Sequence, residues 1–166
     1  MTIAICVLLI GVLGFSNAFV SMGRAEQKTR ESTLAVLAAR RVLASIQAEA
    51  FPEAFRRYNA AGADDPGGAD TAPGASFAVE GLSALDADVD GFAGQVIFPS
   101  PGNGAELRED SIDAALGMPR DLNGDGVIDT ANHATNYLLL PVRVRVDWRS
   151  ASGPAAIELR TMLANY

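Results

Sequence analysis

The residues of this chain best suited to chemistry gather in one acidic, glycine-rich stretch near residue 125. Four side chains with oxygen atoms follow one another at regular spacing, namely Asp121, Asn123, Asp125 and Asp129. They match loop positions 1, 3, 5 and 9 of the EF-hand-type calcium loop, and Gly126 stands at the glycine position 6. The spacing aims the side chains at one centre. We therefore predict a Ca²⁺ site in the loop 121–132.

The other ligands of this site are less regular. The backbone carbonyl of Val127 would occupy loop position 7, and Ile128 stands at position 8. Position 12, usually a bidentate glutamate, is Asn132 here. A metal-free turn rich in Asx and Gly residues is the alternative interpretation. No helix pair is predicted around the loop, so we do not expect a sensor that opens a groove on binding calcium.

The remaining candidates for chemistry favour a chain without catalytic activity. His133 is the single histidine, and with no cysteine near it we expect a solvated loop residue rather than a zinc ligand. Asp86 and Asp90 lie in an acidic turn and, with His133, are weak candidates for a hydrolase. Neither a nucleophile elbow nor a phosphate-binding glycine motif is present.

Composition and charge narrow the class of protein. The chain has 166 residues, of which 49% are hydrophobic, and this excludes a disordered or collagen-like chain. The net charge of -7 argues against a nucleic-acid partner. Residues 59–129 hold fourteen acidic and two basic groups, which suits cation binding or a solvated surface. Cys6 is the single cysteine, so no disulfide forms within the chain.

The N-terminal third of the sequence predicts one long helix, from about Thr2 to about Phe51. Residues 1–23 contain no charge and form a stretch long enough to cross a bilayer, so we expect a transmembrane or filament-core half. Residues 24–58 are expected to form an amphipathic half. Its apolar positions recur at steps of three and four: Val36, Ala39, Leu43, Ile46 and Ala50.

The rest of the chain, residues 59–166, predicts a loop-rich antiparallel β domain. Residues 59–75 read as a loop. Short strands are expected at 76–82 and 94–98, and a helical turn at 110–116. The clearest signal is a β-hairpin of 141–149 and 156–163, in which apolar residues alternate with polar ones and Trp148 belongs to the core. The predicted fold class is α+β, with the amphipathic helix packed on the sheet.

This order of elements resembles type IV pilins and the pseudopilins of type II secretion. The final hairpin, VRVRVDWRSASGPAAIELRTML, is similar to the end of minor pseudopilins and of pilus-modification minor pilins. In those proteins a Val-rich strand reaches a Trp, turns, and returns through a strand with a Thr-Leu-like end. The resemblance covers residues 1–58 and 137–166, and the middle of the chain hardly at all. It implies a pilin-like fold.

The start of the sequence departs from that family. The basic leader, the glycine at the processing site and the glutamate shortly after it are missing, and Arg24 ends the uncharged run early. We therefore expect that the sequence begins inside the family's helix. The alternative is a subunit that lacks the glutamate, as some tip pseudopilins do.

The resemblance implies a structural, minor subunit of a type IV pilus or a type II secretion pseudopilus. Its expected partners are other pilin or pseudopilin subunits, contacted through residues 1–30, and the inner membrane before assembly. The domain would then lie in the periplasm or on a cell-surface filament, stabilised by calcium. The alternatives are a membrane-anchored extracytoplasmic calcium-binding recognition module and a signal-anchored hydrolase.

Overall fold

The computed structural model describes the backbone of residues 2–102 and 104–165, together with the side chains of Phe15, 21–102 and 104–165. Two α-helices, a short 3₁₀ helix and four strands follow one another along the chain: α1 (Thr2–Ala48), α2 (Phe51–Tyr58), η1 (Gly62–Asp64), β1 (Ser76–Phe77), β2 (Gly94–Ile97), β3 (Leu139–Ser150) and β4 (Gly153–Ala164). The predicted α+β class is confirmed.

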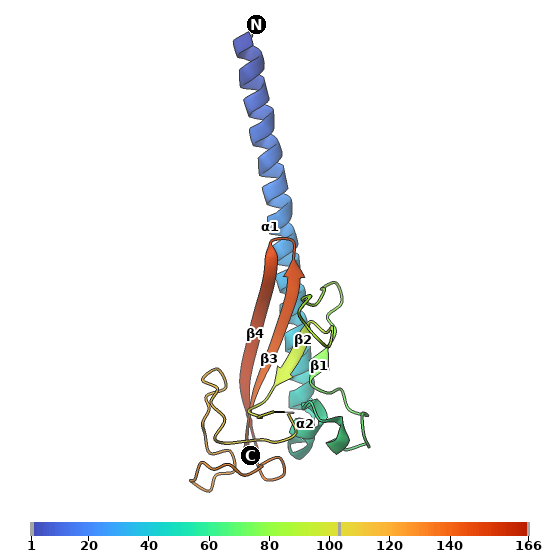
Figure 1. The fold of residues 1–166 in the computed structure, drawn as a ribbon, viewed down its shortest axis with the longest axis vertical. Helices are drawn as coiled ribbons and strands as arrows, with labels where there is room; N and C mark the ends of the chain where they lie inside the picture. Colours follow the sequence, from blue (N-terminus) through green and yellow to red (C-terminus); the bar gives the residue numbers. More distant parts are fainter. Residues whose placement is uncertain (1, 103, 166) are drawn as a thin grey trace.

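One antiparallel sheet and the long helix α1 are the largest elements, and α2, η1 and irregular loops surround the lower end of the sheet (Figure 1). The strands lie in the order β1-β2-β3-β4, and β3 and β4 form a hairpin in which Val144 faces Leu159. The sheet lies beside the second half of α1, while the first half extends alone to the N-terminus (Figure 1). We call the sheet, its loops and the part of α1 that they cover the head (residues 31–165).

The core of the head lies between α1 and the apolar face of β3. Val142, Val144 and Val146 are fully buried, and Trp148 is 2% exposed. These are the alternate residues that the sequence predicts for the apolar face. On β4 the predicted inward residues Ile157, Leu159 and Leu163 are half-buried and pack against this core. The predicted hairpin is confirmed, with each strand longer than expected.

The buried face of α1 differs in part from the predicted stripe. Ala39 and Ile46 are buried and Leu43 is half-buried against the core, as predicted. Ala35, rather than Val36, continues this face toward the N-terminus. Its small side chain keeps the four-residue step from Ala39, whereas Val36 lies to one side of that line.

The long helix ends earlier than predicted, at Ala48, and α2 follows as a separate helix. The reason is Pro52. In a continuous helix its ring would collide with the carbonyl of Ala48, four residues earlier, and it has no N–H to donate. Ala50 instead adopts an extended conformation, with φ -60° and ψ 125°, which places Pro52 in the first turn of α2. The predicted end at Phe51 and the single helix over 24–58 are therefore wrong.

Two other local predictions differ from the structure. The strand expected at 76–82 pairs only at Ser76 and Phe77, because the chain then turns toward α1. Gly81 makes this approach with φ +83°, and a Cβ there would lie 3.2 Å from Cδ1 of Leu34. The helical turn expected at 110–116 is reduced to a hydrogen-bonded turn at 114–117, and residues 110–113 have no regular structure.

The predicted transmembrane segment 1–23 falls mostly on residues 1–14 and 16–20, whose side chains lie outside the described part of the chain. Within the described part, no helix has a stretch both apolar enough and long enough to cross a bilayer.

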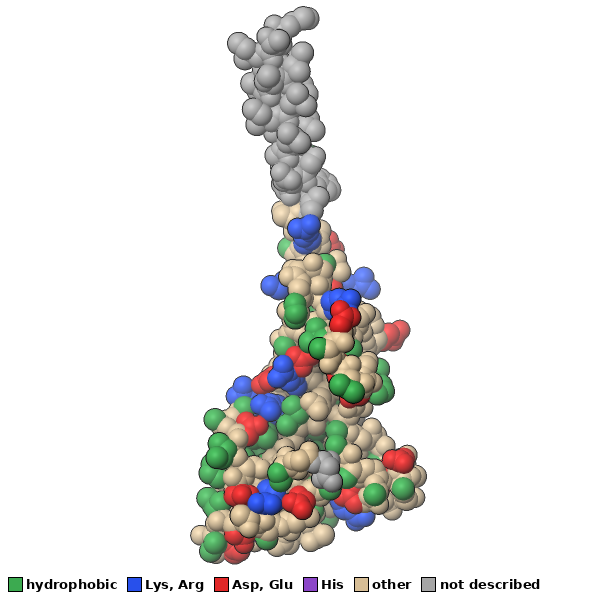
Figure 2. Space-filling view, in the orientation of Figure 1, with side chains coloured by type: hydrophobic (Ala, Val, Ile, Leu, Met, Phe, Trp, Pro, Cys, Tyr) green, Lys and Arg blue, Asp and Glu red, His purple; other side chains and the backbone are tan. Residues whose placement is uncertain are grey.

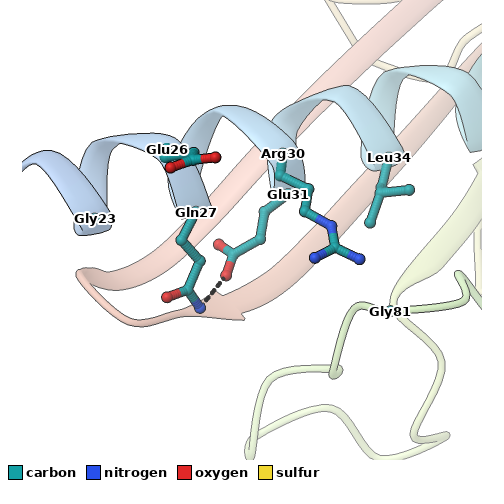
Figure 3. Close-up of a pocket in the computed structure, with 7 residues that line it drawn as sticks. All are labelled: Gly23, Glu26, Gln27, Arg30, Glu31, Leu34 and Gly81. Carbon is teal, nitrogen blue, oxygen red and sulfur yellow. Dashed lines mark hydrogen bonds between the residues drawn. The ribbon is translucent and has the colours of Figure 1, made fainter.

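A buried carboxylate, Glu31, ties α1 to the tip of the hairpin. It is 8% exposed, and its oxygens accept hydrogen bonds from Gln27 Nε2 at 2.9 Å and from Trp148 Nε1 at 3.2 Å. A hydrogen bond from Ser150 is the main reason that the pKa of Glu31 lies below its usual value, and the other two donors add to it. Glu31 also borders a cleft of about 480 Å³ between α1 and Gly81 (Figure 3).

The hydrogen bonds to Glu31 predict how the stability of the head changes at low pH. Because the pKa of folded Glu31 is lowered, its ionised form stabilises the head above its unfolded pKa of about 4.3, and this contribution is lost as the pH falls through the folded pKa. Glu31→Gln should therefore lower the free energy of unfolding at pH 7, and the difference from the unmodified chain should shrink toward pH 3.

The measurement is urea denaturation at several pH values, followed by the fluorescence of Trp148, the single tryptophan. Glu26→Gln is the matched control, since Glu26 is exposed on the same helix. A Glu31→Gln difference that stays constant from pH 7 to pH 3 would contradict this role of the carboxylate.

Candidate metal centre

The predicted calcium-type loop (residues 121–132) lies in the irregular region at the end of the head opposite the N-terminus (Figure 1). Leu122 anchors it. This side chain is fully buried, and its carbonyl accepts hydrogen bonds from the N–H groups of Leu138 and Leu139 at 2.7 and 3.0 Å. The start of β3 therefore fixes the base of the loop.

The loop is wound by its own side chains. Asp121 accepts hydrogen bonds from the N–H groups of Gly124 at 2.6 Å and Gly126 at 2.8 Å, and both glycines have positive φ. Asn123 and Asp125 each accept the N–H two residues further on, in the Asx-turn pattern. The Gly126 and Gly124 N–H groups lower the pKa of Asp121. The turns of the loop therefore favour the ionised form of Asp121.

The side chain of Asn132, the residue at loop position 12, bonds to the backbone instead of pointing at the centre of the loop. Its Oδ1 atom accepts hydrogen bonds from the N–H of Leu107 at 3.1 Å and of Ala134 at 3.0 Å. An amide oxygen has two lone pairs, and both are used here. Val127 and Ile128 are exposed, so the apolar anchor of the loop is Leu122 rather than the residue at position 8.

Glu109, which the sequence does not single out, supports the loop from below. It is fully buried, and Oε1 accepts hydrogen bonds from the N–H of Leu122 at 2.7 Å and of Asn123 at 3.2 Å. Oε2 accepts the N–H of Asp129 at 3.3 Å. One carboxylate thus holds both ends of the calcium-type loop. No sequence spacing predicts this, because Glu109 lies outside the loop motif.

His133 is buried, with 3% of its surface exposed, so the predicted solvated histidine is wrong. Its Nε2 lies 3.0 Å from Oδ1 of Asp129 and 3.7 Å from Oε2 of Glu109. Burial acts to lower the pKa of His133, but the hydrogen bond to Asp129 and the charge of Glu109 outweigh it, and the pKa is raised. The Ala131 N–H and then His133 lower the pKa of Asp129.

Three side chains therefore meet beside the loop. The ligand atoms of Glu109, Asp129 and His133 all lie within 4.8 Å of one another. Of the predicted calcium ligands, Asp129 belongs to this cluster, while Asp121, Asn123 and Asp125 lie in the exposed or half-exposed arm of the loop. The arrangement offers oxygen donors in the loop and one nitrogen donor at its base.

The candidate hydrolase residues are separated by the fold. Asp86 pairs with Arg149 of β3. Asp90 accepts hydrogen bonds from the Ser76 hydroxyl at 2.6 Å and from the Phe92 N–H at 2.9 Å. Neither contacts His133 among the described interactions, since His133 bonds to Asp129 and Asn136.

Comparison of the chain with models of protein families, with curated proteins and with solved structures finds no match.

Proposed function

We propose that this protein is a structural, minor subunit of a filament of the type IV pilus or type II secretion pseudopilus kind. The observation that carries the proposal is the division of α1. This helix has 47 residues, and the first of its described side chains to be buried is Glu31. The preceding part, residues 2–30, would measure about 44 Å at 1.5 Å per residue and extends beyond the head.

The composition of that projecting part supports the same proposal. Residues 1–23 carry no charge, and an apolar helix without a partner is unfavourable in water. Arg24, Lys28 and Arg30 follow in the sequence and are exposed. Figure 2 shows basic side chains on several sides of the helix above the head. Lipid before assembly, and the helices of other subunits afterwards, would cover the apolar part. The head would then lie outside the inner membrane.

In this proposal the calcium-type loop stiffens the head rather than performing catalysis. Asp121, Asn123, Asp125 and Asp129 would supply side-chain oxygens, and Val127 a carbonyl. The loop is at the end of the head farthest from the projecting helix (Figure 1). That position also favours a second candidate function, a membrane-anchored calcium-binding module that recognises a partner outside the membrane.

No nucleic acid is expected as a partner, because the chain has a net charge of -7.

The test is fractionation of the cells that make the protein. The chain should be released with sheared surface or periplasmic filaments, and Leu13→Glu in the uncharged run should abolish its presence in them while the head keeps its stability. Ile112→Glu places the same charge on a head residue that is 94% exposed and is the matched control. A chain found wholly in the membrane fraction would favour the recognition module and reject the filament subunit.

A further inference from the structure

We propose that Glu109, Asp129 and His133 bind a divalent transition-metal ion, with Zn²⁺ as the best-suited species, at a centre distinct in chemistry from the calcium-type loop. This inference does not depend on the filament proposal. It shares one residue, Asp129, with the predicted calcium ligands.

The donor set favours such an ion over calcium. Calcium takes oxygen ligands, whereas an imidazole nitrogen with carboxylate oxygens suits zinc and its neighbours. His133 supplies the nitrogen, and Glu109 and Asp129 supply one oxygen each. Three protein ligands leave a fourth position open, as in zinc sites that also hold a water molecule.

The distances fit a tetrahedral ion. With bonds of about 2.0–2.2 Å, the ligand atoms of a tetrahedral zinc site lie roughly 3.3–3.6 Å apart. Nε2 of His133 is 3.0 Å from the Asp129 oxygen and 3.7 Å from the Glu109 oxygen. These two values lie on either side of the tetrahedral separation, so the two histidine–carboxylate pairs need shifts of only a few tenths of an ångström, and the ligand oxygens of Glu109 and Asp129 lie within 4.8 Å of one another.

The outer nitrogen of the histidine is held in the manner of a metal ligand. Nδ1 lies 3.2 Å from Oδ1 of Asn136 and 3.4 Å from Nδ2 of Asn123. In the tautomer with the proton on Nδ1, this nitrogen donates to Oδ1 of Asn136, and Nε2 turns its lone pair toward two carboxylates. In that tautomer the lone pair and the carboxylate oxygens repel one another at these distances, so either a metal ion or a second proton, on Nε2, must lie between them.

The burial of Glu109 and the negative charge around it also favour a bound cation. Glu109 is fully buried, and its basic partner among the described residues is His133. Asp121, Asp125 and Asp129 add negative charge nearby, in a loop without Lys or Arg. Three backbone N–H groups, those of Leu122, Asn123 and Asp129, already bond to this carboxylate, and a cation beside it would compensate the negative charge that remains in the cluster. Either a proton on His133 or a metal ion can do this, and the experiment separates the two.

The test uses the full chain in detergent, stripped of metal by a chelator and titrated with Zn²⁺ and with Co²⁺. The unmodified chain should bind one Zn²⁺, with a rise in melting temperature, and Co²⁺ should give visible absorption bands. His133→Gln keeps a side chain of hydrogen-bonding capacity but lacks the imidazole, and it should weaken Zn²⁺ binding by at least about tenfold.

Asp125→Ala is the matched control, because Asp125 lies in the calcium-type loop but outside the cluster. It should retain Zn²⁺ binding and lose the response to Ca²⁺, while His133→Gln should do the reverse. If the unmodified chain takes up no Zn²⁺, or if His133→Gln binds it equally well, the proposal is rejected and the cluster is a proton-bridged ion pair. That result would leave the filament proposal and the calcium prediction untouched.

Discussion

Replacing Ala39 by aspartate should unfold most of the head. Ala39 is fully buried on the face of α1 that packs against the sheet, and it belongs to the same core as Val144 and Trp148. A carboxylate there would lose its hydration without gaining a basic partner, which we expect to cost at least about 4 kcal/mol. Domains have a total stability of only about 5–15 kcal/mol, so the loss is a large fraction of it.

Ala44→Asp provides the matched control, because Ala44 is exposed on the same helix. Both substitutions lower helix propensity equally, by less than about 1 kcal/mol, so their difference reports burial. The measurement is urea denaturation followed by the fluorescence of Trp148, which is 2% exposed in the folded head. Equal effects of the two substitutions would mean that α1 does not pack on the sheet as described.

Calcium should stabilise the head through the calcium-type loop. If Asp121, Asn123, Asp125 and Asp129 converge on one ion, three carboxylates repel one another without it. Binding to the folded state alone then contributes about 2.7 kcal/mol when Ca²⁺ is a hundredfold above its dissociation constant. For a chain of this size such a gain should raise the melting temperature by several degrees. Magnesium should do far less, because it dehydrates reluctantly and demands a tighter octahedron.

The control for this prediction is Asp125→Ala. Asp125 is exposed and accepts hydrogen bonds from the N–H of Val127 at 2.8 Å and from Nδ2 of Asn123 at 2.9 Å, so its replacement removes two hydrogen bonds and one repelling charge. These effects oppose each other, and the metal-free stability should stay within about 0.5 kcal/mol of the unmodified chain. The calcium-dependent rise should disappear. Identical melting curves for the unmodified chain in calcium and in chelator would show that the loop binds no calcium.

The parts of the fold that follow from short-range periodicity could be predicted from the sequence. The alternation of Val142, Val144, Val146 and Trp148 with charged residues determines which face of β3 is buried, since strand side chains alternate by geometry. The absence of any stop between Val20 and Leu34 predicts a continuous helix through that part of α1. Pro52 also predicts the break that follows Ala48, because its ring cannot be accommodated inside an uninterrupted helix.

The turns of the calcium-type loop are also local. Gly124 and Gly126 permit positive φ, and Asp121 accepts hydrogen bonds from both of their N–H groups. Each of these interactions joins residues at most five positions apart. The sequence motif therefore predicts a tightly wound loop.

What surrounds the loop was decided by tertiary structure alone. Glu109 accepts hydrogen bonds from Leu122 and Asp129, which lie 13 and 20 positions further along the sequence. The side-chain oxygen of Asn132 accepts the N–H of Leu107, which lies 25 positions earlier. The chain between them is irregular, with no helical or strand period to fix its direction. Whether His133 is solvated or buried beside two carboxylates depends on that path, which is set by packing around buried residues such as Leu107 and Leu122. Local sequence determines the elements and the turns, but the nitrogen donor and its acidic partners come together only when the whole head folds.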